Sequence, residues 1–317
     1  MIMREPKKKH KHSNLSHKEQ RAAYLFLIPA FLGLSLITYL PVLAVFGISF
    51  TDLNTGHFLA NSPLDPPKFV GFDNFIKIFT DARFNYLNSI MVTVYFALLS
   101  VVGSVIYSMI VAMLLNRKVP ARGFFRAIFY VPYILPSTAI MITWHFLLMN
   151  NGGLINHILV GLGLNKSLFL SDASLVIPVL ALIAVWGAGN LIVIFLAGLQ
   201  NVPRVYQEAA EIDGANAWHR FRHITVPCMT PIIFYNILMS LAVNLQVVVP
   251  ALAITKGGPG QSSMFMTYQV YSTGLKGRDY GAGGAMAFVL FIVAAILAAI
   301  LFTTSNRWIF YEGGGDK

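Results

Sequence analysis

Six polar or aromatic side chains interrupt the long apolar stretches of this sequence in three pairs, each with a spacing of four. The pairs are Tyr133 and Ser137, Trp186 and Asn190, and Ser240 and Asn244. Residues four apart share one face of an α-helix, so each pair can present a hydroxyl, an amide or an aromatic ring to one ligand. Such groups suit the hydroxyls of a neutral sugar.

Two neighbours extend this set, because Gln246 lies close to the last pair and Gly187 leaves a gap beside Trp186. We therefore treat these eight residues as candidate substrate-binding residues. Each of them taken singly could instead hold helices together or fill a core.

Catalytic, metal-binding and cofactor-binding residues are not expected in this chain. An intramembrane enzyme would need a buried cluster of His, Asp or Glu, and only His145 approaches one. No G-x-x-x-x-G-K-[S/T] pattern for phosphate binding occurs. The glycine-rich stretches GGPGQSS and GAGGA lack that lysine, so we expect them to form turns and close helix contacts.

Residues 208–227 form a charged segment between two apolar stretches, with three acids, two arginines and two histidines. Pro203 can open a helix whose first turns hold Glu208 and Glu211, where acids favour the positive helix end. Ala209 and Ala210 are small, so another protein could approach the backbone closely.

The same segment carries signals for a turn. Gly214 suits a left-handed residue that ends the first helix, and Asn216 can cap a second short helix. That second helix would carry Trp218, Phe221 and two basic residues, Arg220 and Arg222. The pattern predicts a rigid helix–turn–helix that could push on a partner protein.

The composition places the chain in a membrane. Its 317 residues are 56% hydrophobic and only 11% charged, with a mean hydropathy of +0.66, whereas soluble domains carry about 25% charged residues. Apolar runs long enough to cross a bilayer predict an all-α integral membrane protein with six spans. The expected spans are residues 24–51, 88–115, 127–149, 175–199, 227–254 and 282–304. The third is expected to be broken early by Pro132 and Pro136.

The charges predict the orientation. With these boundaries no Lys, Arg, Asp or Glu lies inside a span, and most of the 23 Lys and Arg residues fall on the side that holds both termini. The positive-inside rule therefore predicts a multi-pass protein of the inner or plasma membrane with both termini in the cytoplasm. We expect a basic cytoplasmic tail at 1–23, a permease domain at 24–304 that includes the charged loop 203–227, and a cytoplasmic tail at 305–317.

The stretch EAAEIDG, followed by ANAWHRFRH and ITVP, resembles the cytoplasmic coupling loop of binding-protein-dependent ABC transporter permeases, with Val226 where that family usually has Leu. We call residues 203–227 the EAA loop. Further stretches, among them FVGFDNFIKIF, FFRAIFYVPYILPS, TKGGPGQSS and YGAGGAMAF, are similar to the first permease subunit of carbohydrate importers, the maltose-permease-like group.

This resemblance implies a type I ABC importer with two permease subunits, which we expect to differ, two ATPase subunits and an extracellular solute-binding protein. ATP and Mg would be bound by the partner ATPase, so this chain is a transport component and not an enzyme. In the family's arrangement Glu208 would pair with a basic residue of the ATPase. The other residues of that contact would be Ala209, Ala210, Asp213 and Gly214.

The candidate substrate-binding residues also fall where the maltose-type permease holds its sugar. Tyr133 and Ser137 match the family's P-Y-x-x-P-S. Ser240 and Asn244 match a Ser and an Asn that lie at the same distance before the family's GGP loop, which is residues 257–259 here. Trp186 and Asn190 differ from the maltose-specific residues, so a different sugar is expected.

Other solutes and mechanisms stay open. The permease could serve glycerol phosphate or an anionic oligosaccharide such as a uronate, which would favour basic residues along the pathway. A secondary transporter would require intramembrane ionisable residues or half-to-half symmetry, and neither is visible. Nucleic acid is not an expected partner, since the net charge of +10 gathers at membrane-flanking positions.

Overall fold

A computed structural model describes residues 17–58, 66–117 and 120–310. Much of the predicted basic tail and the last part of the predicted C-terminal tail lie outside these residues. The chain divides into two compact units, residues 1–47 and 48–317. Within the described residues the structure is helical, and the extended pairings are two isolated bridges, Thr51 with Phe69 and Asn54 with Asp279.

The first unit contains one apolar helix. It comprises α1 (His17–Leu34), a π-helical turn (Ser35–Tyr39) and most of α2 (Leu40–Ile48). The stretch Arg21–Ile48 is long and apolar enough to cross a membrane. Its large hydrophobic side chains are exposed, which suits contact with lipid. The π-helical turn ends two residues before Pro41, which lacks an N–H for the regular helical hydrogen bond.

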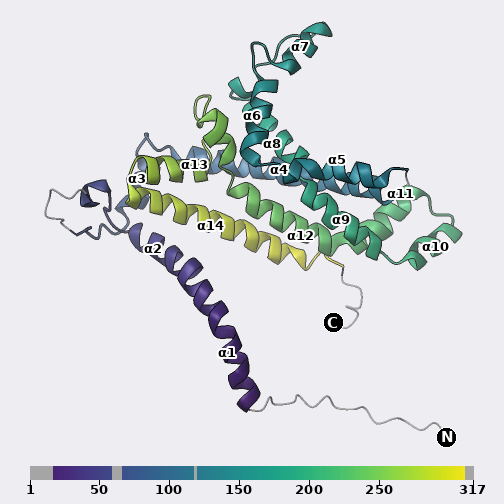
Figure 1. The fold of residues 1–317 in the computed structure, drawn as a ribbon, viewed down its shortest axis with the longest axis horizontal. Helices are drawn as coiled ribbons and strands as arrows, with labels where there is room; N and C mark the ends of the chain where they lie inside the picture. The colour runs from purple at the N-terminus through teal and green to yellow at the C-terminus, as the bar shows by residue number, and fades with distance from the viewer. Residues whose placement is uncertain (1–16, 59–65, 118–119, 311–317) are drawn as a thin grey trace. The chain divides into compact units, whose positions relative to one another are not determined.

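The second unit is built from helices that run from α3 to α14 (Figure 1). They are α3 (Asp73–Thr80), α4 (Tyr86–Asn116), α5 (Arg122–Ile134), α6 (Ser137–Leu147), α7 (Leu154–Gly161), α8 (Val176–Trp186), α9 (Gly189–Asn201), α10 (Arg204–Ile212), α11 (Ala217–Arg220), α12 (Val226–Leu245), α13 (Met266–Val270) and α14 (Tyr280–Ser305). Short helical turns lie at Thr55–Phe58, Phe169–Ser171, Phe221–Thr225, Ala251–Thr255 and Tyr271–Lys276.

Helix α4 is the central element, and α8, α9 and α12 pack along it. Its buried face carries small residues, among them Ser100, Ser104 and Ser108, which let neighbouring backbones approach closely. A Cβ on Gly103 would lie only 2.7 Å from Cγ2 of Val185 in α8. The opposite face of α4 exposes large apolar side chains, and so does α14. The outer surface of these two helices is therefore apolar, as a lipid environment requires.

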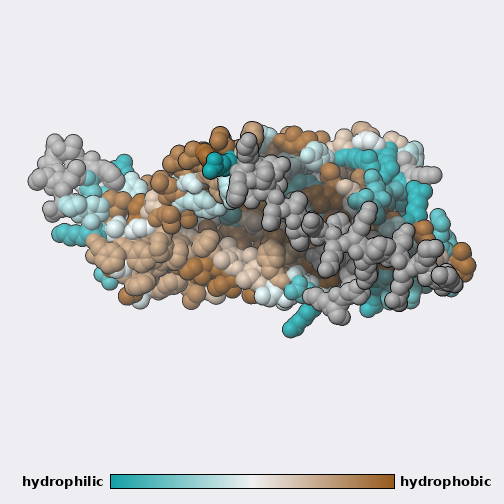
Figure 2. All heavy atoms as spheres, turned by 90° about the horizontal axis from the view of Figure 1, so that it is seen from below, coloured by the Kyte–Doolittle hydropathy of each residue, from teal (hydrophilic) through white to brown (hydrophobic). Residues whose placement is uncertain are grey.

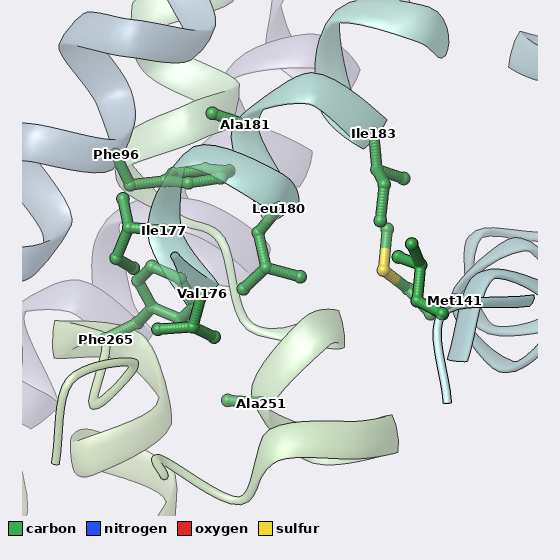
Figure 3. Packing of buried hydrophobic residues seen from close by; sticks show 10 residues of the cluster. Phe96, Met141, Val176, Ile177, Leu180, Ala181, Ile183, Ala251 and Phe265 are labelled. Carbon is green, nitrogen blue, oxygen red and sulfur yellow. The ribbon is translucent and has the colours of Figure 1, made fainter. Parts of the chain in front are cut away.

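One apolar core joins α4, α8 and the segment before α13 (Figure 3). Phe96 and Phe265 meet edge to face with ring centroids 5.2 Å apart, and Val176, Ile177 and Leu180 of α8 pack beside them. This cluster fixes α8 against α4 and so positions the residues that come after α8.

Two of the predicted spans are bent helix pairs. Helices α5 and α6 meet at 97°, and α8 and α9 meet at 49°. The first bend lies at Pro136, because the residue before a proline is pushed out of the helical region, and Leu135 has φ −68° and ψ 145°. Pro132, also predicted to break the span, stays inside α5.

The span predicted at 175–199 is therefore not one continuous helix, since the helix stops at Trp186 and restarts at Gly189. The predicted span at 227–254 was also shifted. Its helix begins at Ala217 and ends at Leu245, and Ala251–Thr255 forms a separate π-helical turn. Within the described residues, four helices are long and apolar enough to cross a membrane, or up to six if each bent pair counts as one span.

Candidate functional site

A cavity of about 470 Å³ lies where the two bent helix pairs approach α12. We call it the central cavity. Its polar lining residues are Ser104, Tyr133, Ser137, Asn190, Ser240 and Asn244. Six of the eight candidate substrate-binding residues line it, counting Gly187. The sequence separates these residues by more than one hundred positions, and the bends bring them together.

Tyr133 and Ser137 reach the central cavity from opposite sides of the α5–α6 bend. The expectation that they share one helix face was wrong, because the bend of 97° falls between them. Both remain at the cavity because Ser137 is the first residue of α6 and Tyr133 lies in the last turn of α5. The Tyr133 side chain is half exposed, so its ring and hydroxyl are accessible.

Asn190 lies in the first turn of α9, directly after the α8–α9 break. The break depends on a close contact, since a Cβ on Gly189 would lie 3.0 Å from the Phe129 carbonyl oxygen and 3.1 Å from Cβ of Tyr133. Helix α9 therefore begins directly against α5, and this places Asn190 beside the α5–α6 bend.

Trp186 does not line the central cavity. It ends α8 and meets Trp144 edge to face, with ring centroids 5.6 Å apart, in a separate apolar cavity of about 360 Å³. The expected helix face shared with Asn190 does not exist, because the helix breaks at Gly187 and Ala188. The prediction from the spacing of four failed here because it assumed a continuous helix.

Ser240 and Asn244 do share one face of α12, as their spacing predicts. The Asn244 amide nitrogen donates to the Ser240 carbonyl oxygen at 2.8 Å and to its hydroxyl oxygen at 3.1 Å. Both residues line the central cavity. Gln246 lies just beyond the end of α12, where its amide donates to the Ala242 carbonyl oxygen at 3.1 Å, and it does not line this cavity.

The lining of the central cavity is neutral. Among the described residues that form it there is no Asp, Glu, Lys, Arg or His, and apolar side chains such as Met141, Leu191 and Met239 complete the wall. Ser104 was not among the predicted residues, although its spacing of four from Ser100 and Ser108 on α4 marks a small polar stripe. Hydroxyls and amides on an apolar wall can hydrogen-bond a neutral polyol without the cost of desolvating a charge.

The EAA loop forms a compact turn at one end of the second unit. Helix α10 ends at Ile212, and Gly214 follows with φ +78°, the left-handed conformation that its position predicts. The Gly214 N–H donates to the Glu211 carbonyl oxygen at 3.1 Å, and the Ala215 N–H donates to the Ala210 carbonyl oxygen at 2.9 Å. These two bonds are the Schellman pattern that closes a helix C-terminus.

Two contacts tie α10 to the helical segment after the turn. The Arg220 guanidinium lies 3.0 Å from the Glu211 carboxylate, and the Gln207 amide donates to the Thr225 hydroxyl at 3.1 Å. The prediction that Glu211 lies in an early turn was wrong, because α10 begins at Arg204 and has nine residues, which puts Glu211 in its last turn.

Asn216 caps the next helix as predicted, since its side-chain oxygen accepts the His219 N–H at 2.8 Å. The helix that it caps is not a separate short one. It continues from α11 through the π-helical turn Phe221–Thr225 into α12 without a break. A displacement of the EAA loop would therefore be transmitted directly along α12 towards Ser240 and Asn244.

The EAA loop is also accessible. Glu208, Ala209, Asp213 and Gly214 are exposed, Ala210 is half-buried, and Ile212 is 87% exposed. Hydrophilic residues are visible at the end of the second unit that carries α10 and α11 (Figure 1 and Figure 2). This exposed, hydrophilic end is suited to contact with water and with a soluble partner.

Comparison with known families gives one match over most of the second unit. The sequence profile described as "Binding-protein-dependent transport system inner membrane component" matches residues 104–310. That range includes the EAA loop and the residues of the central cavity.

Individual relatives cover nearly the whole chain. The probable ABC transporter permease protein YesP of Bacillus subtilis is 34% identical over 95% of this chain and 96% of its own length. The trehalose/maltose transport system permease protein MalF of Thermococcus litoralis is 30% identical over 89% of this chain and 92% of its own length.

A solved structure shares the fold. The crystal structure of a bacterial alginate ABC transporter in complex with an alginate pentasaccharide-bound periplasmic protein aligns with a TM-score of 0.75. The alignment covers 92% of this chain and 96% of that one at 21% sequence identity.

Proposed function

The chain belongs to the family of binding-protein-dependent transport system inner membrane components, and on this basis we propose that it is the permease subunit of an ABC transporter that imports a sugar or oligosaccharide. In this proposal it forms half of the translocation pathway. The names of its relatives, which include a trehalose/maltose permease, support a carbohydrate as the solute.

The observation that carries the proposal is the central cavity with its neutral polar lining. Hydroxyl and amide groups on Tyr133, Asn190 and Asn244 reach it, together with two serines at 137 and 240. A sugar needs such partners on several sides, and apolar surface between them for its C–H faces. A second permease subunit would close the open side.

Anionic solutes are the main alternative. Glycerol phosphate or a uronate oligosaccharide would be held best by Arg or Lys, and the described lining of the central cavity contains neither. The neutral lining therefore favours an uncharged sugar. It also speaks against a secondary transporter driven through intramembrane carboxylates.

We propose a complete transporter built around this chain. In this proposal six spans, counting each bent pair as one, cross the membrane, with both termini in the cytoplasm and the GGP loop outside. A different permease subunit, two ATPase subunits and an extracellular solute-binding protein complete the assembly. ATP with Mg is bound and hydrolysed on the ATPase subunits.

Coupling would run through the EAA loop. Glu208 would pair with a basic residue of the ATPase, while Ala209, Ala210, Asp213 and Gly214 form the contact surface. The unbroken helix from Ala217 to Leu245 supports this route, because it joins the loop to the cavity residues of α12.

The test is sugar uptake by proteoliposomes that contain the whole transporter and its binding protein. Asn244→Ala should weaken transport of the preferred sugar about threefold to tenfold, the range expected for one lost hydrogen bond. Gln246→Ala is the matched control and should leave uptake unchanged, because Gln246 does not line the cavity. Equal effects of the two substitutions would refute the placement of the sugar, and uptake of no carbohydrate would refute the solute class.

A further inference from the structure

A second polar cavity, of about 740 Å³, lies at the end of the molecule that carries the EAA loop. It is lined by three arginines, Arg122, Arg126 and Arg204, together with the amides of Asn116, Gln200 and Gln207. We call it the arginine cavity. It is separate from the central cavity, with no lining residue in common.

The charge in the arginine cavity is uncompensated. Among the described residues that line it there is no Asp or Glu. The ion pairs found within the described part of the chain involve other residues. Three like charges around one space raise one another's energy unless an anion enters.

The two deeper arginines differ in their partners. Nε of Arg122 donates to the Leu115 carbonyl oxygen at 2.6 Å, which caps the C-terminal end of α4. Nε of Arg126 is buried and has no hydrogen-bond partner among the described residues. A buried guanidinium N–H without an acceptor is unfavourable, so the Arg126 side chain gains a hydrogen bond if it turns towards an anion in the cavity.

Two helices begin at this cavity. Arg122 is the first residue of α5 and Arg204 the first of α10, and both residues line the space. Helix N-termini present free backbone N–H groups and a positive dipole end, which add to the attraction for an anion.

We propose that the arginine cavity binds a phosphate group. Arginine presents its N–H groups as a planar fork that matches two phosphate oxygens, and the cavity is large enough for a glycerophosphate head group. The source is an anionic phospholipid or a soluble phosphate. The position favours the lipid, because the cavity lies where the apolar helix α4 ends and α5 begins, at the level of lipid head groups.

The bound phosphate would contact the coupling machinery. Gln207 of α10 and Thr225 of the π-helical turn before α12 line the cavity and are hydrogen-bonded to each other at 3.1 Å. The anion would therefore join the EAA loop to the ends of α4 and α9.

The experiment uses the complete transporter, delipidated in an uncharged detergent at constant ionic strength. Its thermal unfolding midpoint is followed while one of three probes is added, namely short-chain phosphatidylglycerol, short-chain phosphatidylcholine or inorganic phosphate. Phosphatidylglycerol should raise the midpoint saturably, and phosphatidylcholine should do so far less. A response to inorganic phosphate alone would assign the site to a soluble anion.

Variants localise the effect. Arg126→Gln should weaken the response of the wild type about tenfold or more in apparent dissociation constant. Arg117→Gln, which removes one charge from an exposed position outside the cavity, should leave it unchanged. If Arg126→Gln does not assemble, Arg204→Gln tests the same cavity from its exposed edge.

The proposal is overturned if phosphatidylcholine acts as strongly as phosphatidylglycerol, if Arg117→Gln and the cavity variants respond alike, or if no probe binds. These readouts measure anion binding and not transport, so they stand independently of the proposed solute.

Discussion

Gly214→Ala tests whether the EAA loop works as a rigid lever. Gly214 has φ +78°, and an added Cβ would meet nothing within 4 Å. The substitution therefore introduces no clash, and its cost is that of a left-handed conformation for a residue with a side chain, about 1–2 kcal/mol. That cost lowers the population of the closed turn about 5–30-fold relative to its alternatives.

The expected result is a loss of coupling and not of assembly. Stimulation of ATP hydrolysis by the loaded binding protein should fall several-fold, because the turn that joins α10 to the helix leading into α12 is no longer held. Membrane insertion and subunit assembly should stay normal, since the exposed turn lies outside the apolar helices. Gly214→Asn should fall between wild type and Ala, because Asn tolerates the left-handed region better.

Gly163→Ala is the matched control. Gly163 lies just after α7 with φ +77°, and an added Cβ there would also meet nothing within 4 Å, so the local cost is the same at a site far from the EAA loop in sequence. The assay is the ratio of stimulated to basal ATP hydrolysis in the reconstituted transporter. An equal change in both variants, or full coupling in Gly214→Ala, would refute the lever.

Two further predictions concern other parts of the second unit. Gly283→Ala should lower the unfolding midpoint of the transporter by an amount equivalent to about 1–3 kcal/mol, because the added Cβ would lie 2.5 Å from the Gly274 Cα. The control is Gly123→Ala, whose added Cβ would meet nothing within 4 Å and should leave the midpoint unchanged. Asp81 should titrate with a pKa of about 2, below its ordinary 3.8, because the Arg83 side chain and backbone N–H donate to its carboxylate. A depressed pKa in the folded state means that the contribution of this turn to stability is complete above about pH 4 and is lost as the pH falls towards 2. The carboxyl carbon shift of Asp81, followed by NMR across that range, checks this, and a midpoint near 4 would contradict it.

The local features of the EAA loop could be predicted from sequence because neighbouring residues determine them. A glycine in a left-handed turn and an asparagine at a helix N-cap depend on backbone geometry within a few positions. The glycine stretches GGPGQSS and GAGGA also form the turn and the close helix contact that the sequence predicts for them. Gly257 and Gly260 lie in turns with positive φ, and Gly283 packs against the Gly274 backbone.

The central cavity could be predicted only in part. The spacing of four identified Ser240 and Asn244 correctly because α12 is continuous there. The same spacing also selected Tyr133 and Ser137, but these two residues lie on different helices and share no helix face. It paired Trp186 with Asn190, although the helix that carries Trp186 ends before Asn190. Whether a helix bends at a given proline or glycine depends on the neighbour it meets, here the approach of Gly189 to Phe129, and a single sequence does not contain that contact.

The arginine cavity could not be predicted from the sequence at all. Its arginines looked like positive-inside charges in two separate loops. They face one space because α5 and α9 pack together and α10 comes directly after α9. Only the packing of the helices shows whether an arginine is a surface charge that orients the protein in the membrane or a residue that lines a cavity.

The most direct test of the proposed sugar import is ATP hydrolysis by the complete reconstituted transporter. It is measured with the binding protein and a panel of neutral and acidic mono- and oligosaccharides. We expect strong stimulation by one neutral sugar or oligosaccharide, reduced by Asn190→Ala and Asn244→Ala and unaffected by Gln246→Ala. Stimulation by an acidic saccharide or a sugar phosphate alone would contradict the inference from the neutral cavity. Intact basal hydrolysis without a response to any carbohydrate would contradict the assignment to sugar import.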